Sequence, residues 1–153
     1  MRDWSLASLA GLGSAALLGG ALFFQYVVGL APCELCILQR WPHLAAFVIG
    51  VIVWFIPNVW VMALGALAAG TAGALGIYHT GVERGWWEGP THCSGTADLS
   101  GMTPSQMLDT IMAAPVVRCT DVAWEMLGLS MASWNAILSF VLVAVWIVAM
   151  RRA

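Results

Sequence analysis

The sequence predicts an all-α fold: an integral membrane four-helix bundle with a short helix in a long loop. Three observations predict it. The 153 residues are 61% hydrophobic and only 9% charged, whereas soluble domains average about 25% charged residues. Uncharged runs reach or exceed the roughly 20 residues that cross a bilayer. One polar segment, about 80–131, holds six of the eight acidic residues. The net charge of −2, without a basic patch, argues against nucleic-acid binding.

Four membrane spans follow from the positions of the charges. No charged residue lies between Asp3 and Glu34, between Arg40 and Glu83, or between Glu125 and Arg151, and Pro57-Asn58 divides the middle run. The first run is too long for the roughly 7–15 apolar residues of a signal peptide, so we expect it to be retained. The predicted spans of this single membrane domain, residues 1–153, are about 6–30, 37–56, 59–79 and 132–150.

Four spans place both termini on one side and the loops at about 31–36 and 80–131 on the other. The six arginines divide equally between the sides, so the positive-inside rule gives little guidance. All four cysteines fall in the two loops, and clustered cysteines suggest an oxidising compartment. We therefore expect periplasmic loops and cytoplasmic termini. The four are Cys33, Cys36, Cys93 and Cys119.

The long loop carries the signal of a short helix. Thr103 has the character of an N-cap, and Pro104 would occupy the first helical position. Met107, Leu108, Ile111 and Met112 then share one face at helical spacing. Such a helix would lie flat on the membrane surface or pack against the ends of the spans.

Cys33 and Cys36 begin a stripe that continues with Arg40 and His43 along one face of the second span. A redox-active pair is the strongest interpretation of this Cys-x-x-Cys. A zinc site would need a second cysteine pair, but Cys93 and Cys119 stand 26 residues apart. A structural staple would close too small a loop to stabilise much. We expect a redox pair and no metal site.

Arg40 has a functional and a structural interpretation. A helix N-terminus and a nearby arginine both lower a thiol pKa, so Arg40 could stabilise a thiolate. It could also donate to a carbonyl oxygen that gains electron density during reduction, or simply extend toward lipid phosphates. Cys93 and Cys119 likewise allow two roles. They could form a structural disulfide worth roughly 3–4 kcal/mol, or a second dithiol in a relay.

The histidines leave an alternative open. His79, at the end of the third span, could donate to a quinone oxygen or move a proton. Together, His43 and His79 could instead ligate haem in a membrane electron-transfer protein, although no Cys-x-x-Cys-His motif for covalent haem is present. His92 we take to be a solvated loop residue.

The segment PCELCILQR at 32–40, the Cys93–Cys119 offset and residues 124–131 resemble the DsbB family of disulfide bond formation proteins. Residues 24–25 and 78–80 also match family positions. The resemblance implies a four-helix protein of the bacterial inner membrane that reoxidises a periplasmic DsbA-like thiol oxidase and reduces ubiquinone or menaquinone. It implies that DsbA attacks Cys93, that Cys119 exchanges with Cys33, and that Cys36, Arg40 and His79 adjoin the quinone.

Overall fold

The computed structural model describes residues 3–90, 101–113 and 117–153. It confirms the predicted fold class, since four helical segments are long and apolar enough to cross a membrane. The second of these, Glu34–Phe55, contains two helices joined at Gln39. The elements of the bundle are α1 (Asp3–Tyr26), α2 (Glu34–Leu38), α3 (Arg40–Phe55), α4 (Val59–Glu83) and α6 (Met131–Arg152).

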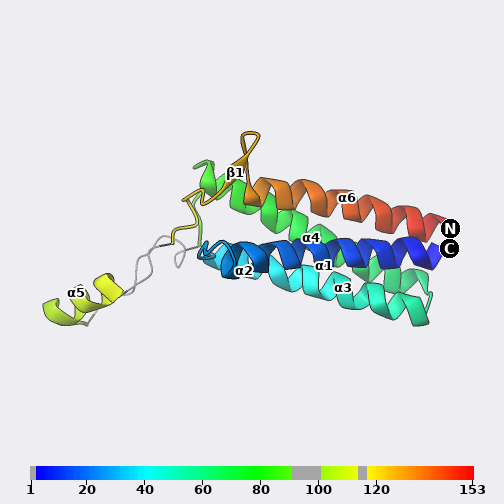
Figure 1. The fold of residues 1–153 in the computed structure, drawn as a ribbon, viewed down its shortest axis with the longest axis horizontal. Helices are drawn as coiled ribbons and strands as arrows, with labels where there is room; N and C mark the ends of the chain where they lie inside the picture. Colours follow the sequence, from blue (N-terminus) through cyan, green and yellow to red (C-terminus); the bar gives the residue numbers. More distant parts are fainter. Residues whose placement is uncertain (1–2, 91–100, 114–116) are drawn as a thin grey trace.

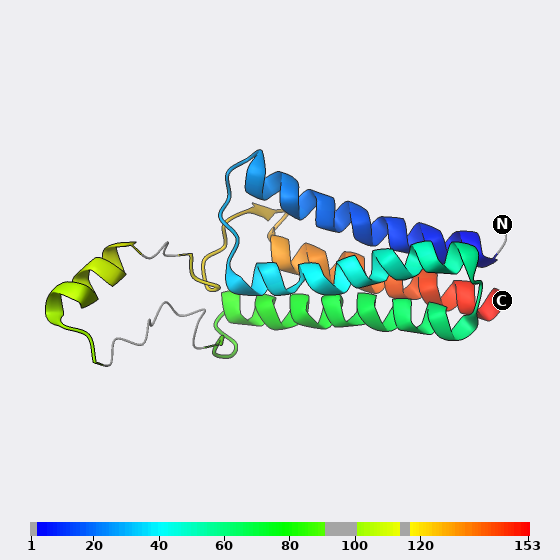
Figure 2. The ribbon, with the colours of Figure 1, turned by 90° about the horizontal axis from the view of Figure 1, so that it is seen from below.

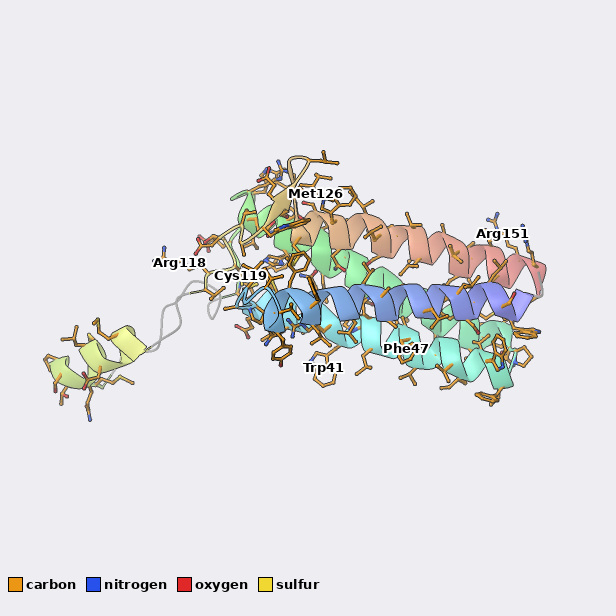
Figure 3. All side chains as sticks on the ribbon, in the orientation of Figure 1. Trp41, Phe47, Arg118, Cys119, Met126 and Arg151 are labelled. Atoms are coloured by element: carbon orange, nitrogen blue, oxygen red, sulfur yellow. The ribbon has the colours of Figure 1, made fainter. Side chains whose placement is uncertain are left out.

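The four spans form a closed ring in which α1 and α4 each pack against both α3 and α6. Both termini lie at one end of the bundle, together with the turn between α3 and α4 (Figure 1). The loops that carry the described cysteines lie at the other end. In Figure 3, Arg151 marks the first end, and Arg118 and Cys119 mark the second. We refer to these as the terminal end and the cysteine end.

Small residues set the packing in the terminal half, as is common between membrane helices. A methyl group on Gly11 of α1 would come within 2.7 Å of the Gly50 Cα on α3. On α4, a methyl group on Gly65 would come within 2.5 Å of the fully buried Trp146 ring of α6. The helix backbones therefore approach closely there. Toward the cysteine end, α1 diverges from the other helices (Figure 2).

The first two spans differ from the predicted boundaries. Helix α1 ends at Tyr26 rather than near residue 30, because Gly29 adopts φ 82° and the Leu30 N–H turns back to the Phe24 carbonyl (3.0 Å).

The second span begins at Glu34 rather than 37. Pro42 has no N–H for the Leu38 carbonyl, so the helical hydrogen bonding is interrupted between α2 and α3.

Helix α4 is one turn longer than its predicted span and ends at Glu83 instead of 79. The helix can include the charged Glu83 because its carboxylate has partners: it accepts a hydrogen bond from Ser130 and lies 3.8 Å from His79 Nε2. After the cap residue Arg84, Gly85 adopts φ 68° and the helix stops. His79 therefore lies inside the last turns of α4, where its ring is fixed by neighbouring helices.

A small antiparallel hairpin precedes α6 and was not predicted. Strand β1 (Glu125–Met126) pairs with β2 (Leu129–Ser130). The two turn residues, Leu127 and Gly128, have φ 56° and 76°, as a two-residue type I′ turn requires. A leucine at positive φ is uncommon, and Leu127-Gly128 lacks the Asn-Gly pattern that usually predicts such a turn.

The predicted loop helix is present as α5 (Pro104–Ala113). In both views it lies beyond the cysteine end, apart from the bundle (Figures 1 and 2). Leu108 and Met112 on its apolar face are 60% and 80% exposed. The alternative that this helix packs against the ends of the spans is therefore wrong.

Candidate redox site

The two cysteines of the Cys-x-x-Cys lie at the start of the second span. Cys33 has extended backbone (φ −75°, ψ 172°) and is the N-cap of α2, with its sulfur accepting the Cys36 N–H at 3.3 Å. The Cys33 thiol donates to the Cys36 sulfur at 2.9 Å, and both cysteines are free. Cys33 is buried and Cys36 is half-buried. The pair is thus a dithiol whose sulfurs are in contact.

The environment of Cys33, which precedes the span, raises the pKa of its thiol. The hydrogen bond to the Cys36 sulfur is the largest cause, and burial is the second. These effects outweigh the amides of the helix N-terminus, which lower the pKa. In the hydrogen bond between the two sulfurs, the Cys33 thiol is the donor and the Cys36 sulfur is the acceptor.

Cys119 lies in the same buried cluster as Cys33, although 86 residues separate them in the sequence. It is 1% exposed and disulfide-bonded. Leu35 and Val82 complete the cluster, with Cys36, Tyr78 and Val117 packed against it. The prediction that Cys119 lies on the same side as the Cys-x-x-Cys is confirmed. Cys93 and His92 lie outside the described residues.

His79 connects α4 to this pair. Its Nε2 lies 3.5 Å from the Cys33 sulfur, and its Nδ1 lies 2.9 Å from Gln39 Nε2. The Gln39 amide is oriented by its other contacts, since Nε2 also donates to the Leu35 carbonyl and Oε1 accepts from Asn135. The amide nitrogen therefore donates to His79 Nδ1. It follows that Nε2 carries the imidazole proton, which faces the Cys33 sulfur and also hydrogen-bonds to the Cys119 backbone.

Arg40 adjoins an apolar cavity of about 440 Å³ between α1, α3 and α6. Its Nη1 donates to Gln25 Oε1 at 2.6 Å, while its buried Nε has no partner among the described residues. Cys36, Gln25 and His79 also line the cavity, so the structure brings these predicted residues to one wall. The remaining wall is largely apolar and includes Leu17, Ala21, Phe24, Trp124, Met131 and Leu138.

His43 lies deeper in the same cavity wall and is 3% exposed. Its Nε2 hydrogen-bonds to Asn135 Oδ1 at 2.7 Å. Both nitrogens of His79 are engaged, Nδ1 by Gln39 and Nε2 by Cys33. Of the two rings only His43 Nδ1 is left without a partner among the described residues, so both imidazoles could not ligate an iron in this arrangement, which does not favour the haem alternative.

Cys33, Cys36 and His79 place their donor atoms within 4.8 Å of one another, a set that soft metal ions accept. The third donor is a histidine rather than a cysteine of a second pair. With its proton on Nε2, however, the imidazole offers no lone pair on the side of the sulfurs. In this tautomer the arrangement favours dithiol chemistry over metal binding.

Sequence reasoning missed two residues that organise the site, Gln39 and Asn135. They hydrogen-bond to each other at 2.6 Å across 96 residues of sequence, and each holds one histidine. A signal existed, because a polar amide inside an apolar membrane run is costly without a partner. Its partner could not be read from local spacing.

The comparisons with known proteins agree with this geometry. The family model described as Disulfide bond formation protein DsbB matches residues 3–149, nearly the whole chain. The chain belongs to the DsbB family. Disulfide bond formation protein B of Verminephrobacter eiseniae is 35% identical over 136 residues, which cover 84% of this chain and 75% of the relative. That of Shewanella frigidimarina is 29% identical over 155 residues, covering 99% and 90%.

No solved structure gives a significant match to the chain. Membership of the DsbB family makes the chain a disulfide-generating oxidoreductase, with the role of a membrane thiol oxidase. Its four apolar helices fit a multi-pass membrane protein. The haem-carrying electron-transfer alternative is not supported.

Proposed function

We propose that this DsbB-family chain is a thiol:quinone oxidoreductase that reoxidises a DsbA-like periplasmic thiol oxidase and reduces membrane quinone. The observation that carries the proposal is that Cys36 and Arg40 share the wall of one apolar cavity. Its volume of about 440 Å³ lies within the range of small-molecule sites. The Arg40 Nε, which has no partner among the described residues, provides a hydrogen-bond donor in a largely apolar wall. These residues fit a ring with polar oxygens and a lipid-soluble tail.

The first step of the proposed mechanism is thiol–disulfide exchange with the partner. A thiolate of the reduced DsbA-like protein attacks Cys93 of a Cys93–Cys119 disulfide, and Cys119 leaves as a thiolate. The partner's second thiol then displaces Cys93, so that the partner gains a disulfide and this chain gains two thiols. DsbA itself is strongly oxidising, at about −120 mV, so its reoxidation needs an effective final acceptor.

The second step passes the electron pair between the loops. Cys119 attacks Cys33 of a Cys33–Cys36 disulfide, and Cys36 leaves. Cys93 then displaces Cys33 from Cys119 and restores the loop disulfide. The burial of Cys119 and Cys33 in one cluster supports this exchange.

The third step reoxidises the dithiol. Quinone, when bound, accepts two electrons and two protons. Cys33 and Cys36 each lose one proton and together two electrons, and a disulfide bond forms between them. Cys36 lines the cavity, and Arg40, held by Gln25, places a fixed positive charge in the same wall. His79 directs its N–H at the Cys33 sulfur.

The proposed location is the bacterial inner membrane, with cytoplasmic termini and periplasmic cysteine loops. The placement of Cys33, Cys36 and Cys119 at one end of the bundle, opposite the termini, supports it. Disulfides persist in the periplasm and are rare in the cytosol. Cysteines at the membrane boundary meet both a water-soluble partner and a carrier dissolved in lipid.

An anaerobic titration of the purified full chain tests the proposal. Reduced DsbA-type partner and a quinone are mixed with catalytic amounts of the chain, and quinone absorbance is followed. We expect one quinone reduced per partner disulfide formed, and no reduction with Cys36→Ser. The control is Thr71→Val on the exposed face of α4, whose hydroxyl bonds only its own helix at the Leu67 carbonyl. Quinone reduction by Cys36→Ser at the unaltered rate would refute the proposal.

A further inference from the structure

His43 has one ring nitrogen that the protein leaves unpaired inside the cavity wall. The side chain is 3% exposed and belongs to the lining of the cavity beside Arg40. Its Nε2 is taken by Asn135, at 2.7 Å. Its buried Nδ1 has no hydrogen-bond partner in the part of the chain that the structure describes. An unpaired polar atom in an apolar wall is unfavourable unless a ligand satisfies it.

The contacts of Asn135 determine what this nitrogen can do. The Asn135 Nδ2 donates to Gln39 Oε1 at 2.6 Å and to the Ala72 carbonyl at 3.4 Å. Both partners are acceptors, so the amide nitrogen faces them and Oδ1 faces His43. The oxygen can only accept, so the N–H that donates this hydrogen bond is on His43 Nε2. In the neutral ring Nδ1 then carries only a lone pair, and His43 offers the cavity a hydrogen-bond acceptor.

An acceptor distinguishes the two redox forms of a quinone. The oxidised form has only carbonyl oxygens, which accept hydrogen bonds, whereas the hydroquinone has two O–H donors. Arg40 Nε is a donor in the same wall and suits either form. His43 follows Cys36 by seven residues on one helical stripe, a rise of about 10 Å. An aromatic ring with oxygens on opposite sides can reach both ends of this stretch.

We propose that His43 Nδ1 accepts a hydrogen bond from the hydroquinone and so makes the cavity selective for the reduced carrier. This inference rests on the proposed quinone reduction. The net reaction is dithiol plus quinone to disulfide plus hydroquinone, with both protons supplied by the thiols. His43 neither gains nor loses a proton in it. By binding the product more strongly than the substrate, His43 favours electron transfer out of the dithiol.

The test is a comparison of two dissociation constants, measured by anaerobic equilibrium dialysis on the detergent-solubilised full chain with its cysteines oxidised beforehand, so that no dithiol reduces the quinone probe. The probes are a short-tailed benzoquinone and its chemically prepared hydroquinone. The unmodified chain should bind the hydroquinone more tightly. Because one hydrogen bond is worth about tenfold in affinity, His43→Leu should weaken hydroquinone binding by about that factor. Its quinone binding should stay within about twofold of the unmodified chain, since quinone makes no bond to Nδ1.

Ser139→Ala is the matched control. Ser139 is fully buried on α6, and its hydroxyl is likewise unpaired among the described residues, but it lies outside the cavity lining. Its removal should change neither constant. His43→Gln keeps an amide N–H for Asn135 and an oxygen acceptor, so it should retain hydroquinone selectivity. It also provides the measurement if His43→Leu does not fold by circular dichroism.

The outcomes separate this inference from the proposed function. A selective loss of hydroquinone affinity in His43→Leu, with selectivity retained in His43→Gln, supports the role of His43. Equal losses for both probes, no loss, or tighter binding of quinone by the unmodified chain overturns that role and leaves quinone reduction standing. If the unmodified chain binds neither probe, the proposed function itself fails.

Discussion

The Cys33 sulfur lies 3.5 Å from His79 Nε2, a contact between side chains 46 residues apart in the sequence. Gln39 fixes the ring by donating to Nδ1, so the proton on Nε2 faces the sulfur. A sulfur that leaves during disulfide exchange gains negative charge, and a hydrogen bond to a charged acceptor is stronger than one to a neutral acceptor. We therefore expect His79 to position and stabilise Cys33 during exchange.

Replacement of His79 by leucine should slow exchange at Cys33. Loss of one hydrogen bond to a developing thiolate is worth about 1.5–3 kcal/mol, or roughly 10- to 100-fold in rate. The measurement is the rate at which a small dithiol reduces the Cys33–Cys36 disulfide, followed by rapid acid quench and thiol labelling. Thr71→Val on the same helix serves as the control. An unchanged rate in His79→Leu would show that the contact is only structural.

The two thiols of the reduced pair should differ in alkylation. The raised pKa of Cys33 leaves less thiolate at neutral pH, and the thiolate is the nucleophile. Cys36 should therefore be alkylated first near pH 7, and Cys33 should remain the slower of the two thiols as the pH is raised. Mass spectrometry after timed iodoacetamide treatment reads both sites.

Replacement of Cys36 by alanine removes the largest cause of the raised Cys33 pKa. In that variant Cys33 should react at a lower pH than in the unmodified dithiol, although burial still opposes ionisation. Alkylation of Cys33 before Cys36, or no change of its pH profile in Cys36→Ala, contradicts the assignment of the Cys33 thiol as the hydrogen-bond donor.

Gln25 should matter for quinone affinity more than for turnover. Its Oε1 accepts from Arg40 Nη1 at 2.6 Å and holds the guanidinium at the cavity wall. In Gln25→Leu, Arg40 loses this anchor, and we expect KM for quinone to rise about 5- to 10-fold from the loss of one hydrogen bond. The kcat at saturating quinone should fall less. Gln25→Glu keeps an acceptor oxygen and should restore KM, whereas a fall in kcat alone would contradict a positioning role.

The packing of α4 against α6 predicts a pair of stability changes. In Gly65→Ala, the added methyl would lie 2.5 Å from the Trp146 ring, which is fully buried. Overpacking of this kind costs about 1–3 kcal/mol. In Gly19→Ala, the methyl meets no heavy atom within 4 Å. Thermal unfolding in detergent should show a lower midpoint temperature for Gly65→Ala and an unchanged midpoint temperature for Gly19→Ala.

The spans could be predicted because a bilayer demands long apolar helices, and such runs are visible directly in the sequence. Their ends could not. Val27–Leu30 is as apolar as α1, yet Gly29 at positive φ takes the chain out of the helix. At the other extreme, Glu83 remains helical because Ser130, far along the chain, satisfies its carboxylate. Helix ends depend on backbone angles and distant partners, which composition does not report.

The placement of Cys36 and Arg40 on one wall could be predicted because these residues are close in the sequence. The network from Cys33 through His79, Gln39 and Asn135 to His43 could not. It joins three spans, and each link pairs a donor with an acceptor from a different part of the chain. Only the folded bundle specifies which nitrogen of each ring carries the proton.

The contact of Gly11 with Gly50 has a consequence for the opposite end of the molecule. These two residues clamp α1 to α3 in the terminal half, and Gln25 at the cavity stands 14 residues, or about 20 Å of helix, farther along α1. A methyl group on either glycine would push α1 away from α3, so two residues far from any sulfur help to set the spacing of the helices around the cavity.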